Sequence, residues 1–367
     1  MTGYWLINAM RQRIPIENVY YLFCYAWDLF PEGKVIGVGA VESPRIWDLF
    51  VSVLLRGVKS LRRRGLDRDY TEFEEELPTI RGRIVVGDTL RRNLLIFGRA
   101  SCRFDELRHD VLHNQIIKAT LRRLTNTEDL DDKLREQLRA SAKVFSEISD
   151  ITVTTSVFRR VQLSRNNRSY HLLLRICELV HSALLPAEGG EGTKFTDILE
   201  DEAKMDTVFE AFVRNFFRVE QREFSVKREW IQWDAQALNR ESAQYLPAMH
   251  TDITLRSKNR IVIIDTKYYP EALVKNQFGD KKIRSDHLYQ LYSYLKNVKS
   301  QSTHQSTAQG ILLYPTVSQS LDLAFIIGGL CVQVRTIQLD QPWQQIHKEL
   351  CALLSPSAEP GTYPVAA

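Results

Sequence analysis

The sequence predicts an α/β (α+β) protein of two domains, because helical and strand-like patterns alternate in both halves of the chain. In the N-terminal half, apolar residues recur at helical spacing on both sides of a region of short, glycine-punctuated alternating runs. In the C-terminal half, apolar strand-like runs are flanked by amphipathic helical segments, which is typical of a mixed sheet covered by helices. A chain of 367 residues is long enough for two such domains.

The composition is that of an ordinary folded protein, with 44% hydrophobic and 26% charged residues. The formal net charge of +4 mildly favours a polyanionic partner. We find no signal-peptide pattern and no apolar run near the ~20 residues that a membrane-spanning helix needs, so we expect no contact with a membrane. The 5 cysteines are scattered and form no C-x-x-C pair, which predicts reduced thiols in a cytoplasmic protein.

Two helices are expected at the start of the chain. Residues 15–29 form the first, and their aromatic side chains are expected in the core, with a partner interface as the alternative. The second begins at Ser43 and Pro44, which suit an N-cap and a first helical turn, and ends at Gly65. The later elements of this half are expected to be helices at 110–124 and 131–148 and a strand at 151–155.

The region from Leu66 to Phe104 predicts a small antiparallel sheet, with strands at 80–86, 94–97 and 100–104. It contains six arginines: Arg81, Arg83, Arg91, Arg92, Arg99 and Arg103. Such a projection is suited to docking guanidinium groups on acidic groups or nucleotide phosphates of a partner protein. A solvated surface or direct contact with DNA would be the alternatives.

The polar stretch at 164–169 predicts a domain boundary, with 186–193 as the alternative. The expected domains are therefore residues 1–165 and 166–355, followed by a flexible tail at 356–367. In the second domain, helices are expected at 170–185, 201–217, 286–295 and 343–354, and strands at 252–255, 261–268 and 310–314.

Two carboxylates and a lysine are expected to converge at the end of a buried strand. Asp265 and Lys267 follow the apolar run at 261–264 and are two residues apart, so their side chains point to the same side. The turn at 257–260 makes Asp252 the neighbour of Asp265 across a hairpin. A surface hairpin with a salt bridge is the alternative, but three such groups at the end of a buried strand favour a functional site.

This group of residue types suits phosphodiester hydrolysis. Mg²⁺, for which Mn²⁺ can substitute, prefers oxygen ligands from one or two carboxylates together with water and phosphate. Asp252 and Asp265 would bind the metal ion, with the backbone carbonyl of Thr266 as a third protein ligand. Lys267 would orient the attacking water or balance charge in the transition state.

The next helix adds further candidates. Gln290 and Tyr294 are four residues apart, so they share one helix face that would look back at the strand ends. Gln290 is a candidate catalytic residue. Lys281, Lys282 and Arg284, in the preceding loop, would contact DNA phosphates together with Tyr294.

The pattern Asp…Asp-x-Lys followed by Gln-x-x-x-Tyr resembles the PD-(D/E)xK nuclease superfamily in its RecB-like branch. The resemblance implies a restriction-endonuclease-like αβα core for the C-terminal domain. Thr251 stands where a proline often precedes the first aspartate. The branch also carries an early glutamate that binds metal; Glu210 is the best match, with Glu202 as the second.

Further segments resemble the McrC family: IPIENVYYLFCYAW at 14–27, RGRI at 81–84, NQIIKATL at 114–121, TDITL at 251–255, IDTKYY at 264–269 and LYQL at 288–291. The resemblance extends over nearly the whole chain. It implies a Mg²⁺-dependent endonuclease subunit of a modification-dependent restriction system, which cleaves double-stranded DNA containing methylcytosine. It also implies docking on a hexameric ring of McrB, an AAA+ GTPase whose GTP hydrolysis it stimulates, and pairing between two nuclease subunits during double-strand cleavage.

Two weaker patterns have simpler interpretations. His109 and His113 resemble a zinc-binding H-E-x-x-H motif, but Asp110 replaces the glutamate and no third ligand is evident; Asp110 suits an N-cap. The glycine-rich residues 189–194 lack Walker A spacing, so GTP would be used by the partner and not bound by this chain. A non-catalytic adaptor that activates an AAA+ motor, and a self-sufficient nuclease, remain as alternative functions.

Overall fold

The computed structural model describes residues 14–30, 45–128, 130–186, 193–195, 199, 201–236, 238, 242–269, 272–275, 280–301, 307–317 and 320–355. The chain divides into two compact units. We call them the sheet unit (Met1–Lys34 with Asp197–Ala367) and the arm unit (Val35–Thr196). The residues expected to cap the second helix, Ser43 and Pro44, and the expected tail at 356–367 lie outside the described residues.

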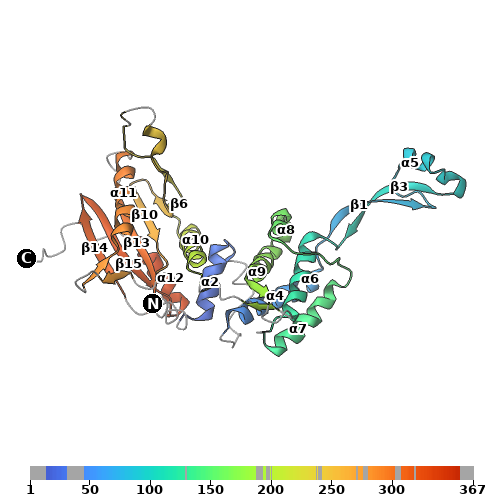
Figure 1. Cartoon of the computed structure of the whole chain (residues 1–367), viewed down its shortest axis with the longest axis horizontal. Coiled ribbons are helices and arrows are strands. Elements are labelled where there is room, and N and C mark those ends of the chain that lie inside the picture. The colour runs from blue at the N-terminus through green and yellow to red at the C-terminus, as the bar shows by residue number, and fades with distance from the viewer. Residues whose placement is uncertain are drawn as a thin grey trace, which may run out of the picture. The chain divides into compact units, whose positions relative to one another are not determined.

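The arm unit contains a helical body and a long β arm (Figure 1). Its helices are α4 (Ile46–Arg64), α5 (Val86–Arg91), α6 (Leu112–Thr125), α7 (Asp132–Ala142), α8 (Thr155–Arg160) and α9 (Ser169–Ala183). Its strands are β1 (Asp69–Leu77), β2 (Arg83–Ile84), β3 (Ala100–Arg108), β4 (Leu184–Pro186) and β5 (Thr193–Phe195). Helix α4 packs on α7 and α9, and α6 packs on the same two helices, which buries their apolar faces.

The boundary between the units differs from the predicted one. Residue 165 lies inside the arm unit because α9, expected to open the second domain, packs on α4 and α6. The approach is close at Gly57, where an added Cβ would lie 2.2 Å from a methyl group of Leu173. The division after Thr196 lies nearer the alternative boundary at 186–193.

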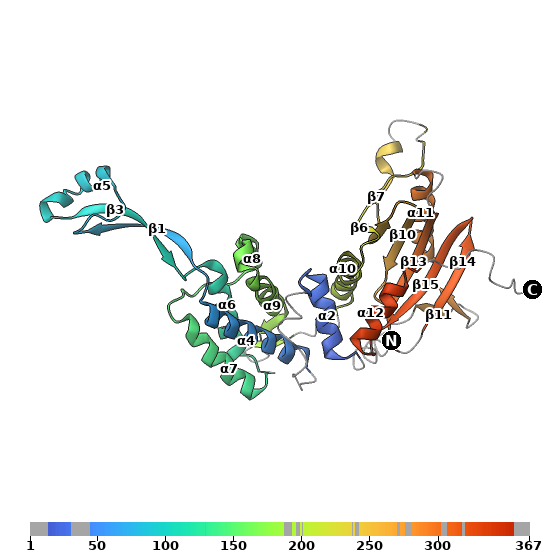
Figure 2. The same ribbon diagram turned by 180° about the vertical axis from the view of Figure 1, so that it is seen from behind.

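The arm is a three-stranded antiparallel sheet in the order β1-β3-β2, and β1 and β3 pair from Asp69↔Arg108 to Leu77↔Ala100. In both views the arm extends away from the helical body and carries α5 at its far end (Figures 1 and 2). Residues 94–97 form a 3-10 helix and not the expected strand. Their flanking residues Asn93 (φ 49°) and Gly98 (φ 65°) adopt left-handed backbone conformations, which break a strand.

Two smaller expectations for this unit were wrong. Residues 151–154 have no secondary structure, so the expected strand at 151–155 is not formed. Asp110 is not an N-cap: its carboxylate accepts hydrogen bonds from the Ser149 backbone N–H (2.8 Å) and from Gln115 (2.9 Å), and Val111 occupies the N-cap position of α6.

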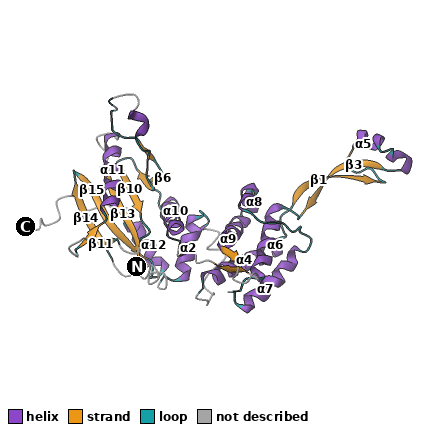
Figure 3. Cartoon of the chain, in the orientation of Figure 1, coloured by secondary structure: helices purple, strands orange, loops and turns teal. Residues whose placement is uncertain are grey.

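The sheet unit is an α/β structure around a six-stranded mixed sheet (Figure 3). Its helices are α2 (Ile16–Ala26), α10 (Glu202–Glu220), α11 (Ser285–Gln301) and α12 (Trp343–Ala352). The sheet has the order β14-β15-β13-β10-β9-β6, with strands β14 (Asp322–Ile327), β15 (Leu330–Gln338), β13 (Thr307–Thr316), β10 (Arg260–Thr266), β9 (Ile253–Arg256) and β6 (Ser225–Lys227). Two short hairpins are added by β7 (Trp230–Ile231) with β8 (Met249–His250), and by β11 (Leu273–Lys275) with β12 (Lys281–Ile283).

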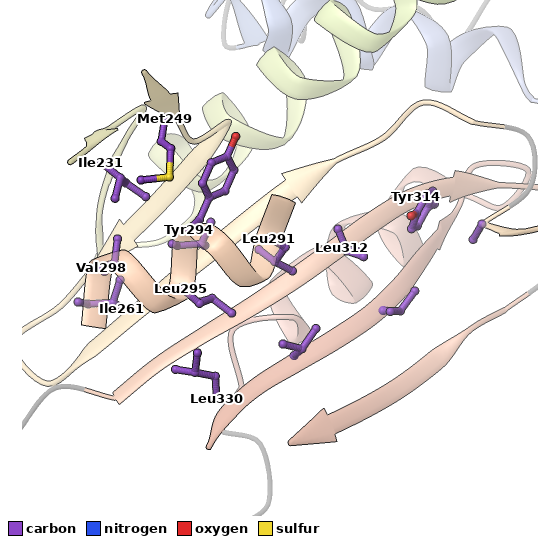
Figure 4. Close-up of a cluster of buried hydrophobic side chains, with 14 residues drawn as sticks. Ile231, Met249, Ile261, Leu291, Tyr294, Leu295, Val298, Leu312, Tyr314 and Leu330 are labelled. Carbon is purple, nitrogen blue, oxygen red and sulfur yellow. The ribbon is translucent and has the colours of Figure 1, made fainter. Parts of the chain in front are cut away.

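The central strand β10 is covered on both faces, as its apolar run predicted. It pairs in parallel with β13 and antiparallel with β9. Ile261 and Ile263 face the core beneath α11, where Leu291, Leu295 and Val298 of the helix point toward the sheet (Figure 4). Val262 and Ile264, which alternate with them, are also fully buried, and α10 and α12 contact the sheet as well. No helix in the described part of the chain is long and apolar enough to cross a membrane.

Helix α2 belongs to the sheet unit, although its sequence position predicted the N-terminal domain. Its aromatic side chains are core residues: Tyr25 is fully buried and packs against Phe216 of α10 and Trp343 of α12. Polar contacts fix its position, because Asn18 donates to the Leu339 backbone carbonyl at 2.8 Å and the Tyr25 hydroxyl donates to Glu220 at 2.6 Å. Helix α2 therefore completes the core of the sheet unit.

We predict that Tyr25→Ala lowers the free energy of unfolding of the sheet unit by about 3–5 kcal/mol, since it empties an aromatic site in the core. Tyr25→Phe keeps the ring and loses only the hydrogen bond to Glu220, so a loss of about 1–3 kcal/mol is expected. Urea denaturation of the full chain measures both. Tyr70→Ala on the arm, where the side chain is 71% exposed, is the control. Equal stabilities of Tyr25→Ala and the control would contradict this packing.

Candidate functional site

The β9–β10 hairpin brings the two predicted carboxylates together. The strands pair with Ile264 opposite Ile253, and the Ser257 backbone N–H donates to the Arg260 carbonyl at 2.9 Å to close the turn. One step further along this register, Asp265 lies opposite Asp252. The sequence prediction that they are neighbours across a hairpin is therefore confirmed.

Asp252 is held by the residue that follows its partner. Its Oδ2 atom accepts hydrogen bonds from the Thr266 backbone N–H (2.9 Å) and the Thr266 hydroxyl (3.2 Å). Thr266 is itself buried at the end of β10. These two bonds fix the orientation of the Asp252 carboxylate toward the strand end.

Asp265 is fully buried, and Lys267 is the cation beside it. Lys267 Nζ lies 3.0 Å from Asp265 Oδ2, whereas Asp265 Oδ1 accepts no hydrogen bond from any described residue. The same ammonium group donates to Gln290 Oε1 at 3.1 Å, and Gln290 donates through Nε2 to the Tyr294 hydroxyl at 2.8 Å. The face of α11 that carries Gln290 and Tyr294 is therefore directed toward the strand end, as their spacing of four residues predicted.

Burial makes this carboxylate pair electrostatically costly. Burial, followed by the neighbouring Asp252 carboxylate, raises the pKa of Asp265 to about 7. Burial also raises the pKa of Asp252, against the opposing effects of Lys267 and the Thr266 hydrogen bonds. For Lys267, burial would lower the pKa, but the attraction of Asp265 and then Asp252 outweighs it and raises the pKa. The site therefore concentrates negative charge that one lysine only partly balances.

Helix α10 places two further acidic residues, Glu210 and Asp206, within electrostatic reach of the site. Glu210 is half-buried and is paired with Arg214 of the same helix and with Arg228, whose Nε lies 3.4 Å from Glu210 Oε1. Burial and then Asp252 raise the pKa of Glu210, so its carboxylate lies within electrostatic reach of the site. Glu202, the second sequence candidate, is exposed in the first turn of the helix.

Sequence reasoning missed Asp206. Its Oδ1 atom accepts a hydrogen bond from the Tyr268 backbone N–H at 3.0 Å, just beyond the strand end, and its charge acts on Asp252, Asp265 and Lys267. It lies one helical turn before Glu210, so the i, i+4 spacing of two acids on one helix was the available signal. Asp206 is exposed and its carboxylate can reach solvent.

The basic residues expected to contact DNA have different settings. Lys281 and Lys282 are exposed but lie in strand β12, paired with β11, and not in a loop. Arg284 follows this strand and stacks its guanidinium 4.7 Å from the centre of the Tyr269 ring. Tyr294 of α11 is only 6% exposed, and its ring points toward Met249 and Ile231 in the hydrophobic core (Figure 4), so its burial favours positioning Gln290 over contact with DNA.

The residues fit a hard divalent cation. Asp265 Oδ1 is a buried anionic oxygen that accepts no hydrogen bond within the described residues, and a cation would satisfy it. No group of three or more His, Cys, Asp or Glu side chains in the described part of the chain is arranged to hold a metal ion. Mg²⁺ needs only one or two protein carboxylates, with backbone carbonyl, water and phosphate oxygens completing its shell.

The two histidines that resemble a zinc motif both contact Asp67. His109 Nδ1 lies 3.3 Å from the Asp67 backbone carbonyl, and His113 Nε2 lies 2.9 Å from the Asp67 carboxylate.

The arginines of the arm are mostly paired within the arm. Arg103 donates to Glu74 of the acidic strand β1 at 2.8 Å, Arg92 pairs with Glu76 and Asp88, and Arg91 with Asp88. Arg81 pairs with Glu106 at 3.6 Å, and Arg99 donates to the Glu76 backbone carbonyl at 2.9 Å. Arg83 is exposed and forms no ion pair with a described residue.

Apolar side chains are exposed instead at the far end of the arm. We call this set the apolar tip: Val86 60%, Leu90 58%, Leu95 63%, Ile96 79% and Phe97 73% exposed. All five lie between β2 and β3, in α5 and the 3-10 helix. Exposed apolar clusters of this kind mark interaction sites.

The fold and site define a mixed α/β chain in which two carboxylates and a lysine meet at the end of a central strand. The chain matches the family model described as McrBC 5-methylcytosine restriction system component over residues 19–315. It belongs to this family, as its resemblance to McrC sequences predicted.

Known proteins agree with this assignment. The chain is 33% identical to the Type IV methyl-directed restriction enzyme EcoKMcrBC of Escherichia coli (strain K12) over 337 residues, which is 92% of this chain and 96% of that protein. Its fold is similar to a chain in a refined half-complex from the tetradecameric assembly of Thermococcus gammatolerans McrB AAA+ hexamers with bound McrC. That match has a TM-score of 0.58 and 18% identity, and covers 93% of this chain and 77% of the other.

In the absence of divalent metal, the buried carboxylate should destabilise the protein at high pH. Because the pKa of Asp265 is about 7 in the folded protein and about 4 when unfolded, the folded form binds more protons between these values, and stability falls as pH rises through them. We predict that Asp265→Asn in EDTA is more stable than the parent by about 1–3 kcal/mol at pH 8.

The difference should shrink as the pH is lowered toward 4, and urea denaturation at several pH values measures it. Mg²⁺ should raise the thermal midpoint of the parent more than that of Asp265→Asn. A stability difference that does not depend on pH would contradict this electrostatic account.

Proposed function

We propose that the chain is the endonuclease subunit of a McrBC-type restriction complex and cleaves methylcytosine-containing DNA by Mg²⁺-dependent phosphodiester hydrolysis. The observation that carries the proposal is the pairing of the buried Asp265 with the partly buried Asp252 at the end of a central strand, with Lys267 beside them. Nothing in packing requires a fully buried carboxylate that has an oxygen without a hydrogen bond and a second carboxylate beside it, so a function has to account for the pair. Family membership supports the same reading.

Each residue of the centre has a separate role. Asp252, Asp265 and the Thr266 carbonyl would hold Mg²⁺, for which Mn²⁺ can substitute, and Asp206 and Glu210 of α10 would add negative charge that acts on Asp252. When bound, the metal polarises the phosphate and lowers the pKa of a water molecule. Thr266 orients Asp252 through two hydrogen bonds. Lys267 places a positive charge where the phosphate gains negative charge in the transition state, and Gln290 holds the lysine there.

The second part of the proposal concerns the partner. A solved relative contains McrB AAA+ hexamers with bound McrC, and we propose that this chain likewise docks on a hexameric AAA+ ring and stimulates its GTPase, without binding GTP itself. The arm is the docking element, but its apolar tip replaces the arginines as the main contact. Four of the six arginines already form ion pairs within the arm, and two of these four pair with Glu72, Glu74 and Glu76 of β1, whereas the tip side chains are exposed.

A non-catalytic adaptor is the second candidate function. The arm favours it, since docking needs no cutting centre. The Asp252–Asp265 pair argues against an adaptor, because burying a carboxylate costs folding free energy and an adaptor would gain nothing in return. A self-sufficient nuclease is less supported, since the arm unit would then have no role. Cleavage assays on methylated plasmid separate the three functions. A self-sufficient nuclease cleaves the plasmid alone, a nuclease subunit cleaves it only with the AAA+ ring and GTP, and an adaptor cleaves it in neither case.

We predict that Asp265→Ala and Lys267→Ala each lower the rate of plasmid cleavage by at least about 100-fold, because each removes a charge that acts in the transition state. Gln290→Ala should cost about 10-fold, since it acts through Lys267. Stimulation of the partner GTPase should be unchanged in all three. Asp286→Ala, an aspartate 74% exposed on α11, is the matched control. Normal cleavage by Asp265→Ala or Lys267→Ala would exclude this centre.

For the docking surface, we predict that Ile96→Asp lowers GTPase stimulation at least about tenfold, because it places a charge in an apolar contact. The variant should unfold like the parent, since Ile96 is 79% exposed. Tyr70→Asp, at the other end of the arm, is the matched control, and Arg83→Glu tests docking by charge. Full stimulation by Ile96→Asp with a loss in Arg83→Glu would show that arginine, and not the apolar tip, makes the contact.

A further inference from the structure

A short β extension leads directly into the proposed cutting centre. Strands β7 and β8 pair as Trp230↔His250 and Ile231↔Met249. The ladder continues to Thr251, whose backbone N–H donates to the Glu229 carbonyl at 3.0 Å and whose hydroxyl accepts from the Glu229 N–H at 3.0 Å. The next residue along the chain is Asp252. The extension is therefore built into the backbone of the site.

One side of the extension is anchored on α11. Ile231 and Met249 are each 5% exposed and share a hydrophobic core with Tyr294 and Val298 of this helix (Figure 4). Figure 2 shows β7 near the same helix. Just beyond β7, the Asp234 backbone N–H donates to the Asn297 side chain at 2.6 Å. The base of the extension is thus a fixed part of the unit.

The opposite side presents a large aromatic surface. Successive residues of a strand point to opposite sides, so Trp230 and His250 point away from the side that Ile231 and Met249 bury. The two rings contact each other, yet Trp230 remains 70% exposed. A tryptophan this exposed, on a rigid support, offers a planar face to a ligand.

Positive charge lies close to Trp230 in the sequence. Arg228 is two residues before Trp230, and its side chain is 54% exposed. Its Nε atom is 3.4 Å from Glu210, the α10 acid that lies within electrostatic reach of Asp252. Lys227, the preceding residue, is exposed as well. An exposed aromatic face has the chemistry of a nucleotide-binding platform when cations precede it by two and three residues and its strand partner leads into a proposed phosphodiester-cutting centre.

We propose that Trp230 and Arg228 bind an unpaired nucleotide next to the scissile phosphate, with the indole stacked on the base and the guanidinium on its phosphate. This inference rests on the proposed nuclease function and deepens it, because it names the form of DNA that the centre accepts. A base inside an intact duplex has both faces covered by its neighbours, so the platform selects DNA whose strands are locally opened. Stacking is tolerant of sequence, since every base has a flat aromatic face.

The test uses the full chain carrying Asp265→Ala, which should bind DNA without cutting it. Its probes are two fluorescently labelled duplexes of the same sequence, one fully paired and one with a central unpaired 2-aminopurine. Adding Trp230→Ala should weaken binding of the unpaired duplex by about 5- to 100-fold, as expected for the loss of one stacked base. It should also abolish quenching of the 2-aminopurine fluorescence. Binding of the paired duplex should change less than about twofold.

Two further variants serve as controls. Trp230→Phe keeps an aromatic face and should retain most of the affinity and quenching, which separates stacking from a folding defect. Tyr70→Ala removes an equally exposed aromatic side chain on the arm and should have no effect. Unchanged binding and quenching in Trp230→Ala, or an equal loss for both duplexes, would overturn the stacking site.

Cleavage of modified plasmid by the wild-type chain with its AAA+ partner is measured in parallel. Cleavage together with unchanged binding in Trp230→Ala would overturn the platform while leaving the nuclease function in place. Lack of cleavage under all conditions would overturn the nuclease function, and the platform with it.

Discussion

The ion pair between Asp265 and Lys267 is the interaction around which the sheet unit is organised. A carboxylate with no exposure, beside a second carboxylate, is tolerated only because an ammonium group lies 3.0 Å away and because the surroundings hold both in place. The covered sheet fixes β10, and α11 fixes Lys267 through Gln290. The apolar core therefore also holds the Asp252 and Asp265 carboxylates close together. A bound cation would reduce the repulsion between these two carboxylates that Lys267 leaves unbalanced.

This constraint explains why distant parts of the chain are needed for one site. Helix α10 carries Asp206 and Glu210, and its other contacts include α2, which comes from the start of the chain. The hydrogen bonds of Asn18 and Tyr25 fasten α2 to the sheet unit. The arm unit is inserted between α2 and α10 in the sequence, whereas Asp252, Asp265 and Lys267 all belong to the sheet unit. The proposed division of labour, cutting in one unit and docking in the other, follows from this layout.

Local sequence patterns predicted the Asp252–Asp265–Lys267 site. They could not predict strand β1 or the place of α2, because both depend on long-range contacts. The turn at 257–260 and the two-residue period of β10 were enough to place Asp252, Asp265 and Lys267 together, since both are properties of a single hairpin. Strand β1 was missed because its acidic sequence is stable as a strand only opposite the arginines of β3, a pairing that local propensity does not contain. The place of α2 depends on partners about two hundred residues away in sequence.

The central claim is that the Asp252–Asp265 pair binds the metal ion used for cleavage, and Mn²⁺ tests it most directly. Crystals of the full chain soaked in Mn²⁺ should show an anomalous peak within about 2.0–2.3 Å of a carboxylate oxygen of each aspartate. Crystals of Asp265→Asn treated in the same way should lack it. A parent crystal with no peak between these carboxylates, or with its strongest peak at another group of acids, would contradict the account.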